Sequence, residues 1–223
     1  MIHPFAIHGD HSQIVANNNT GLLTMTMNRR RFVGGLGLGA VSLATPAVFA
    51  SVRVDTMPTL LAQARAALLT HGARVPYRDR VGLVDFAAPS GLPRLQIVDL
   101  GNGRVLSNLL VAHGRGSDPA NTGLLQRFSN QPGSNASSGG SFLIGDTYIG
   151  KHGRSRRLHG LEPQNDQALA RAIVIHSADY VSEGRAQSSG RVGRSQGCFA
   201  VSHEDLGDVL ALLGPGRLLL AAK

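Results

Sequence analysis

Two residues of this sequence have the types and the spacing needed for covalent chemistry on a carbonyl group. Cys198 is the single cysteine of the 223 residues, and His176 precedes it by 22 positions. His176 follows the apolar run 172–175, and Cys198 begins the apolar run 198–201, a pattern typical of buried strands. If the two strands are neighbours, the imidazole can take the thiol proton and leave a thiolate nucleophile. We therefore expect Cys198 to be a nucleophile and His176 to be its base.

A glycine directly before the cysteine suits the second need of such a reaction, which is stabilisation of a tetrahedral oxyanion. A tight turn at Gly197 can expose the backbone N–H groups of Gly197 and Cys198 to one point in space. The pattern alone leaves two interpretations of the lone thiol open. It is either a reactive group or a buried apolar side chain without a chemical role.

An export signal is predicted ahead of these residues. Asn28–Phe32 contains paired arginines, and the weakly apolar, glycine-rich run that follows ends in Ala50. This pattern is typical of a twin-arginine signal peptide over residues 25–50 that is cleaved after its last residue. The alternative, a membrane anchor, is disfavoured by the short run and by Pro46. We expect a periplasmic protein that is not inserted in the membrane after cleavage, and we leave residues 1–24, a disordered leader or the result of a wrong start codon, out of the fold.

Charge and composition limit the partners of the chain. The formal net charge is +8, so that a basic surface could meet nucleic acid, an anionic membrane or an anionic polymer. The sequence has no nucleic-acid-binding motif, and we expect no nucleic-acid partner. The histidines do not have the spacing of metal ligands, so that we expect no metal and no cofactor. The sequence does not indicate the oligomeric state.

The elements that must position the two reactive side chains are mainly short strands. Apolar runs predict strands over residues 95–100, 104–112, 141–145, 147–149, 172–175, 198–201 and 218–220. Helices are expected over residues 55–72, 165–171 and 202–213, and loops over residues 113–140, 150–160 and 182–197. The sum is a mainly β domain with a few short helices over residues 86–223, preceded by a helix and a linker over residues 51–85.

Residues on both sides of the cysteine resemble a known catalytic signature. The segments Ile175–Tyr180 and Gly193–Val201 are similar to that of the YkuD-like L,D-transpeptidases, in which a histidine, a loop and Ser-x-Gly-Cys follow one another. The similarity is greatest to the branch of murein L,D-transpeptidase catalytic domains, whose other blocks resemble residues 112–117, 128–130, 150–153 and 158–161. The resemblance extends over about residues 86–220. It implies a β-sandwich-like or barrel-like fold and a two-step acyl transfer.

The resemblance also implies roles for individual residues. Cys198 matches the nucleophile, His176 the general base, and Ser177 the residue whose backbone carbonyl orients the imidazole. Gly197, together with Cys198, matches the oxyanion donors. The residues implied to bind substrate lie beside the signature and in the other similar blocks: Arg194, Ser195, His113, Lys151, His152 and Gly153.

Two positions depart from the family pattern. Many YkuD-like enzymes have His or Arg before the Gly-Cys pair and Arg or Asn two places after the cysteine, where this chain has Gln196 and Ala200. If a substrate carboxylate is bound here, another cation has to contact it.

The substrate implied by the resemblance is a peptidoglycan stem tetrapeptide. Cys198 would attack the carbonyl of its third residue and expel the terminal D-Ala. Transfer of the acyl group to an amine of another stem makes a cross-link, whereas transfer to water makes the enzyme an L,D-carboxypeptidase, and the sequence does not choose between them. Two alternatives stay open: a non-catalytic cell-wall-binding module in which Cys198 is buried, and another Cys/His cell-wall peptidase.

Overall fold

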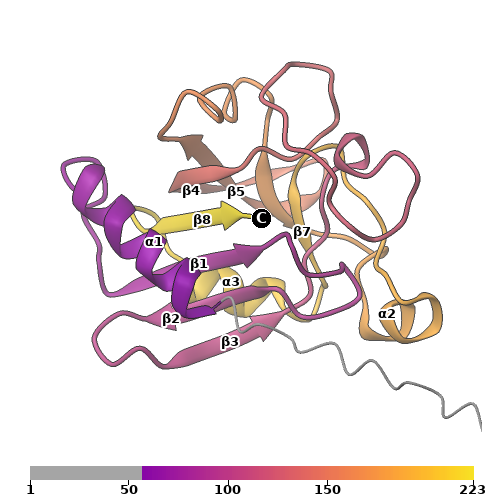
Figure 1. The fold of residues 1–223 in the computed structure, drawn as a ribbon, viewed down its shortest axis with the longest axis horizontal. Helices are drawn as coiled ribbons and strands as arrows, with labels where there is room; N and C mark the ends of the chain where they lie inside the picture. Colours follow the sequence, from indigo (N-terminus) through magenta and orange to yellow (C-terminus); the bar gives the residue numbers. More distant parts are fainter. Residues whose placement is uncertain (1–56) are drawn as a thin grey trace, which may run out of the picture. The chain divides into compact units, whose positions relative to one another are not determined.

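The computed structural model describes residues 57–223, which form a mainly β body with three α-helices (Figure 1). The predicted leader, the predicted twin-arginine signal and the first residues after it lie outside this described part. No helix in residues 57–223 combines the length and the apolar character needed to cross a membrane.

Eight strands form one sheet. In chain order they are β1 (Arg80–Asp85), β2 (Leu95–Asp99), β3 (Val105–Leu109), β4 (Gly140–Gly150), β5 (Gly153–Gly160), β6 (Val174–Ser177), β7 (Phe199–Val201) and β8 (Leu218–Ala222). Across the sheet the order is β3-β2-β1-β8-β4-β5-β6-β7. The pairs β1–β8 and β6–β7 are parallel, and the other pairs are antiparallel. The helices are α1 (Met57–Thr70), α2 (Glu183–Ser189) and α3 (Leu206–Leu212), with a 3-10 turn at Arg115–Ser117.

The two edges of the sheet approach each other. Ala112, three residues beyond β3, forms an antiparallel bridge with Ala200 of β7, and its N–H donates to the Ala200 carbonyl at 2.8 Å. The sheet therefore curves toward a barrel. The predicted fold class, mainly β and β-sandwich-like or barrel-like with a few short helices, is confirmed.

Two apolar clusters cover the two faces of the sheet. One centres on Phe86, Phe142 and Phe199 and includes the apolar face of α3. The centroid of the Phe199 ring lies 5.7 Å from that of Phe86 and 5.6 Å from that of Phe142. On the other face α1 packs against β1 and β8 (Figure 1). The residues that α1 buries recur every four positions, as expected of a helix with one apolar face: Leu60, Ala64 and Leu68.

Residues 57–85 belong to this same body. β1 pairs with β2 on one side and with β8 on the other, which places it inside the sheet. Since α1 packs on β1 and β8, the expected boundary at residue 86 does not separate a linker from the domain.

Four local predictions differ from the structure. The loop expected over residues 150–160 is mostly the strand β5, which pairs with β4 and β6. The two strands expected over residues 141–145 and 147–149 are one strand, β4, because a register shift between Ile144 and Thr147 lets it bend and continue. Residues 165–171 form turns instead of a helix. The loop expected over residues 182–197 contains α2, because Ser182 accepts from the Arg185 N–H and Gly190 ends the helix at a φ of 68°.

Candidate active site

Two neighbouring parallel strands carry His176 and Cys198: His176 lies near the C-terminal end of β6, and Cys198 directly before the N-terminal end of β7. β6 and β7 lie side by side with His176 next to Ala200. Cys198 directly precedes β7 and lies two positions before Ala200, so that its side chain is on the same face of the sheet as His176. Both side chains line one cavity of about 520 Å³.

The His176 imidazole is buried, with 2 % of the residue exposed, and is held in one orientation. Its Nδ1 donates to the Ser177 backbone carbonyl at 2.8 Å, which makes Nε2 the acceptor nitrogen of the neutral ring. Burial lowers the pKa of His176, the hydrogen bond to Ser177 partly offsets this, and the charges of His152 and Lys151 lower it further. A neutral ring that presents Nε2 can act as a general base.

The Cys198 thiol is half-buried and donates to the Ala172 backbone carbonyl over 3.5 Å. Within residues 57–223, no hydrogen bond joins its Sγ to the His176 ring. Burial raises the pKa of Cys198, while a backbone hydrogen bond and the charges of Lys151 and Arg171 lower it in part. Burial thus favours the thiol over the thiolate.

Gly197, directly before the cysteine, has a φ of 120° that residues with a Cβ rarely adopt. A Cβ there would lie 2.8 Å from the Ala136 carbonyl oxygen and from Ile173 Cδ1. The Gly197 N–H donates to the Ser195 hydroxyl at 3.0 Å, and that hydroxyl donates to the Cys198 carbonyl at 2.7 Å. The expected oxyanion donor at Gly197 is thus already hydrogen-bonded to Ser195 in this state. In the described part of the chain, no side chain accepts a hydrogen bond from the Cys198 N–H.

The nucleophile loop, residues 194–198, is held by segments far away in sequence. The Ser195 N–H donates to the His113 carbonyl at 2.9 Å, and the Ser195 carbonyl accepts from the Arg115 N–H at 2.8 Å. The Ser137 hydroxyl donates to the carbonyl of the loop glycine at 3.1 Å. The shape of the loop therefore depends on contacts that exist only in the complete fold.

His113, which the resemblance implied to bind substrate, lies in the interior without exposed surface. Its Nδ1 accepts from the Arg94 guanidinium at 2.8 Å, and its Nε2 lies 3.5 Å from the carboxylate of the buried Asp118. Burial and the Arg94 charge lower the pKa of His113 to about 4, so that the ring is neutral at neutral pH. Since the ring is buried beside Arg94 and Asp118 and the His113 carbonyl accepts from Ser195, His113 supports the nucleophile loop and does not line the cavity.

Sequence reasoning misses Arg94 and Asp118, which complete this buried network. Arg94 is 2 % exposed and donates twice to the Val111 carbonyl, at 3.0 and 2.9 Å. Asp118 accepts from the N–H groups of Thr122 and Gly123 at 2.9 and 2.8 Å. A charged residue before an apolar strand is usually on the surface, so that no local signal marks Arg94 as buried.

The cavity around Cys198 is strongly cationic. Among the described residues that line it, none is acidic and four are Lys or Arg: Arg115, Lys151, Arg171 and Arg194. Arg171 donates to the Ser129 carbonyl at 2.6 Å, and Arg194 donates to the Asp118 carbonyl, so that both guanidinium groups hold neighbouring loops. The Arg115 and Lys151 side chains are exposed and are available to an anion.

The six residues implied to bind substrate do not all reach this cavity. Four of them line it: Arg194, Ser195, Lys151 and His152. Gly153 is the first residue of β5, has a φ of 72°, and does not line it. Tyr180 and Arg115 line the cavity although sequence reasoning does not single them out, and burial together with the nearby Cys198 raises the pKa of Tyr180 to about 12.

A model of the L,D-transpeptidase catalytic domain matches residues 55–221, which is most of the sequence. The chain belongs to the L,D-transpeptidase catalytic domain family. The family resemblance seen in the sequence is thereby confirmed. No curated protein matches this L,D-transpeptidase family member.

Solved structures of several L,D-transpeptidases are similar to this family member at low identity. An L,D-transpeptidase from Mycobacterium smegmatis is 13 % identical with a TM-score of 0.39, over 65 % of this chain and 59 % of that chain. One from Stackebrandtia nassauensis is 13 % identical with a TM-score of 0.41, over 76 % and 68 %. The helical cell shape determining protein of Campylobacter jejuni is 12 % identical with a TM-score of 0.41, over 73 % and 58 %. The chain thus spans 59 % of the length of the mycobacterial protein.

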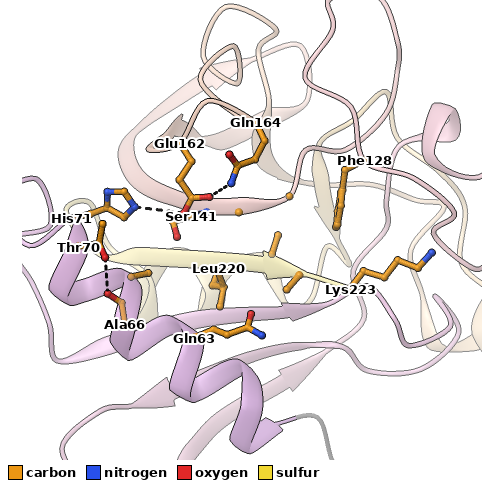
Figure 2. Close-up of a pocket in the computed structure, with 15 residues that line it drawn as sticks. Gln63, Ala66, Thr70, His71, Phe128, Ser141, Glu162, Gln164, Leu220 and Lys223 are labelled. Atoms are coloured by element: carbon orange, nitrogen blue, oxygen red, sulfur yellow. Dashed lines mark hydrogen bonds and ion pairs between the residues drawn. The ribbon is translucent and has the colours of Figure 1, made fainter.

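A second, larger cavity of this L,D-transpeptidase family member shares no residue with the first. It has a volume of about 720 Å³ and lies between α1, the end of β8 and the start of β4 (Figure 2). His71 and Glu162 form an ion pair across it at 3.5 Å, and it is lined by no cysteine. In residues 57–223, no cluster of three or more His, Cys, Asp or Glu side chains is arranged to hold a metal ion.

Proposed function

We propose that this chain is a peptidoglycan L,D-transpeptidase or L,D-carboxypeptidase that acts through a Cys198 thioester, with His176 as general base. The observation that carries this proposal is the position of both side chains on one face of the parallel pair β6–β7, in one cavity. Family membership supports acyl transfer by an L,D-transpeptidase catalytic domain.

In the first half-reaction, the Cys198 thiol turns from the Ala172 carbonyl toward His176 and gives its proton to Nε2. The sulfur forms a bond to the carbonyl carbon of the third stem residue, and the carbonyl π electrons move to oxygen. The Cys198 N–H, and the Gly197 N–H once Ser195 releases it, donate to that oxyanion. The C–N bond then breaks, and the amine of the terminal D-Ala leaves with the proton held by His176.

In the second half-reaction, His176 takes a proton from an incoming amine or water as it attacks the thioester. The tetrahedral intermediate expels the Cys198 thiolate, which recovers a proton. Ser177 keeps the imidazole in the required tautomer through its carbonyl. Either acceptor fits this chemistry, since both deliver a lone pair and a proton to the same base.

The charge of the cavity supports an anionic peptide as substrate. A stem peptide carries several carboxylates, and the cavity offers cations without a compensating acidic side chain among the described residues. Ala200 lies in the buried strand β7 and has no charge to offer. We assign the carboxylate contact to Arg115 and Lys151, with Arg194 and Ser195 shaping the loop beside them. Action on peptidoglycan also fits the predicted export to the periplasm.

The test of this proposal is product analysis with the purified chain and a stem tetrapeptide. Mass spectrometry is expected to show release of D-Ala and, on incubation without an acceptor, a tripeptide product. Cys198→Ala and His176→Gln are each expected to abolish turnover. Release of D-Ala that persists in Cys198→Ala contradicts the thioester mechanism, and binding of wall peptides without turnover by the wild-type chain favours a wall-binding module. Cleavage at another bond favours a different Cys/His cell-wall peptidase.

A further inference from the structure

The turn between β4 and β5 places a second histidine on the proposed base. The rings of His152 and His176 are stacked, with centroids 4.2 Å apart and planes inclined by 18°. His176 is buried in β6, whereas His152 is exposed in the turn. The register of the sheet explains the contact, because Ser155 of β5 pairs with His176 and His152 lies three positions before Ser155 in the turn.

The stack completes the restraint on the imidazole. The hydrogen bond from Nδ1 to Ser177 fixes one edge of the His176 ring but leaves rotation about that bond open. A parallel ring on its face removes this freedom and covers the face from water. An aromatic contact of this kind is stabilising beyond the area it buries, which favours one rotamer of the ring.

We propose that His152 is a positioning residue that fixes the ring plane of His176 and keeps this base neutral. The inference rests on the proposed role of His176. The implied role of His152 in binding substrate is a different one, since it would use the ring nitrogens and not the ring face.

The charges around the pair make protonation of both rings unfavourable. Lys151 lies in the same turn as His152, and the other charged or titratable side chains of the cavity are Arg115, Arg171, Arg194, Tyr148, Tyr180 and Cys198. None of these is acidic at neutral pH, so that no group compensates two stacked imidazolium ions. Burial and Lys151 lower the pKa of His152, and burial, His152 and Lys151 lower that of His176.

The sign of the effect follows from this arrangement. The pKa of His176 is lower in the fold than that of a free imidazole, so that the base stays neutral and active as the pH falls toward that lowered pKa. If the charge of His152 is removed, the pKa of His176 rises and activity is lost at a higher pH. If the ring is removed as well, water reaches His176, its pKa rises further and its orientation is lost.

Three variants separate these contributions. His152→Phe keeps a flat ring without a charge, His152→Ala removes the ring, and His203→Ala removes an exposed histidine that lines a different cavity. For each we would measure kcat and KM for D-Ala release as a function of pH. The pKa of His176 would be measured by NMR of 15N-labelled histidine in a Cys198→Ala background. The alkylation rate of Cys198 by iodoacetamide would report on the thiol without substrate.

We expect His152→Phe to retain kcat and KM within about threefold, with the acid limb of the profile moved to higher pH. We expect His152→Ala to lower kcat about five- to tenfold, the loss that corresponds to one aromatic contact, with little change in KM, and His203→Ala to behave as the wild type. If His152→Phe and His152→Ala lower kcat/KM equally, and both do so by raising KM, the inference is overturned in favour of a role of His152 in substrate binding. An unchanged pKa of His176 in both variants would also overturn it. Either result leaves the proposed function standing, because that is tested by Cys198→Ala and His176→Gln.

Discussion

Burial shifts the pKa of the thiol and the pKa of the imidazole in opposite directions, and each shift favours the neutral form of its group. It raises the pKa of Cys198 and lowers the pKa of His176, because a charge is less stable in a poorly hydrated site. Burial thus favours the neutral thiol and imidazole over the thiolate and imidazolium. Under the proposed function, proton transfer would accompany the attack on the substrate carbonyl.

A prediction about specificity belongs to Arg115. Arg115→Gln is expected to lower kcat/KM for a tetrapeptide with a free C-terminal carboxylate by roughly tenfold, the usual loss of one charge-assisted hydrogen bond. The same peptide with a C-terminal amide has no carboxylate to lose, and its turnover is expected to be unchanged. The measurement is kcat/KM of the wild type and of Arg115→Gln with each of the two peptides.

Arg154→Gln is the matched control, since Arg154 is an exposed cation that does not line the cavity. It is expected to treat both peptides as the wild type does. If Arg115→Gln and Arg154→Gln lower the turnover of both peptides alike, the effect is general electrostatics and Arg115 does not recognise the carboxylate.

Among the elements, the sequence predicts strands better than it predicts what surrounds them. The apolar runs before His176 and after Cys198 locate β6 and β7, because a short continuous apolar run is typical of a buried strand. Their parallel pairing, which brings the two side chains to one face, depends on the whole sheet and has no local signal. The helix α2 could have been found, since Ser182 and Gly190 are ordinary cap residues.

Histidines in glycine-rich loops are the least predictable part of the site. The sequence treats His113 and His152 alike, as loop residues of similar blocks. In the structure, His113 is buried beside Arg94 and Asp118, whereas His152 lies on the turn that covers His176. The difference arises from which strand each loop follows, and that is a property of the sheet order.

The nucleophile loop makes a prediction at the scale of elements. Gly197→Ala is expected to destabilise the fold by about 2–4 kcal/mol and to lower turnover at least about 100-fold, because a Cβ at this φ meets backbone and the oxyanion donors shift. Thermal unfolding and D-Ala release measure the two effects.

The control for this variant is Gly207→Ala in α3, where a Cβ meets nothing within 4 Å. It is expected to raise stability by about 0.5–1 kcal/mol, since alanine is the better helix former, and to leave turnover unchanged. Wild-type turnover in Gly197→Ala would show that the loop conformation seen here is not required for catalysis.

For the whole molecule, the buried network around His113 predicts how stability depends on pH. The pKa of His113 is lowered from 6.5 to about 4, so that the unfolded chain binds the proton more readily than the fold. Its contribution to stability is complete above pH 6.5 and is lost as the pH falls toward 4. The loss is on the order of 3 kcal/mol.

Urea unfolding at several pH values between 4 and 7 measures this slope, and His113→Gln is expected to reduce it. If that variant does not fold, NMR of the wild-type ring reports the same pKa directly. A ring that titrates near 6.5 in the folded protein would contradict the prediction.

The bridge between Ala112 and Ala200 has a consequence for how a peptide reaches the site. Many proteins bind extended peptides by letting them add as one more strand at a free sheet margin. Here the margin next to Cys198 is already occupied by the protein's own chain. Under the proposed function, a stem peptide would therefore reach Cys198 through the cationic cavity and not by adding a strand at this margin.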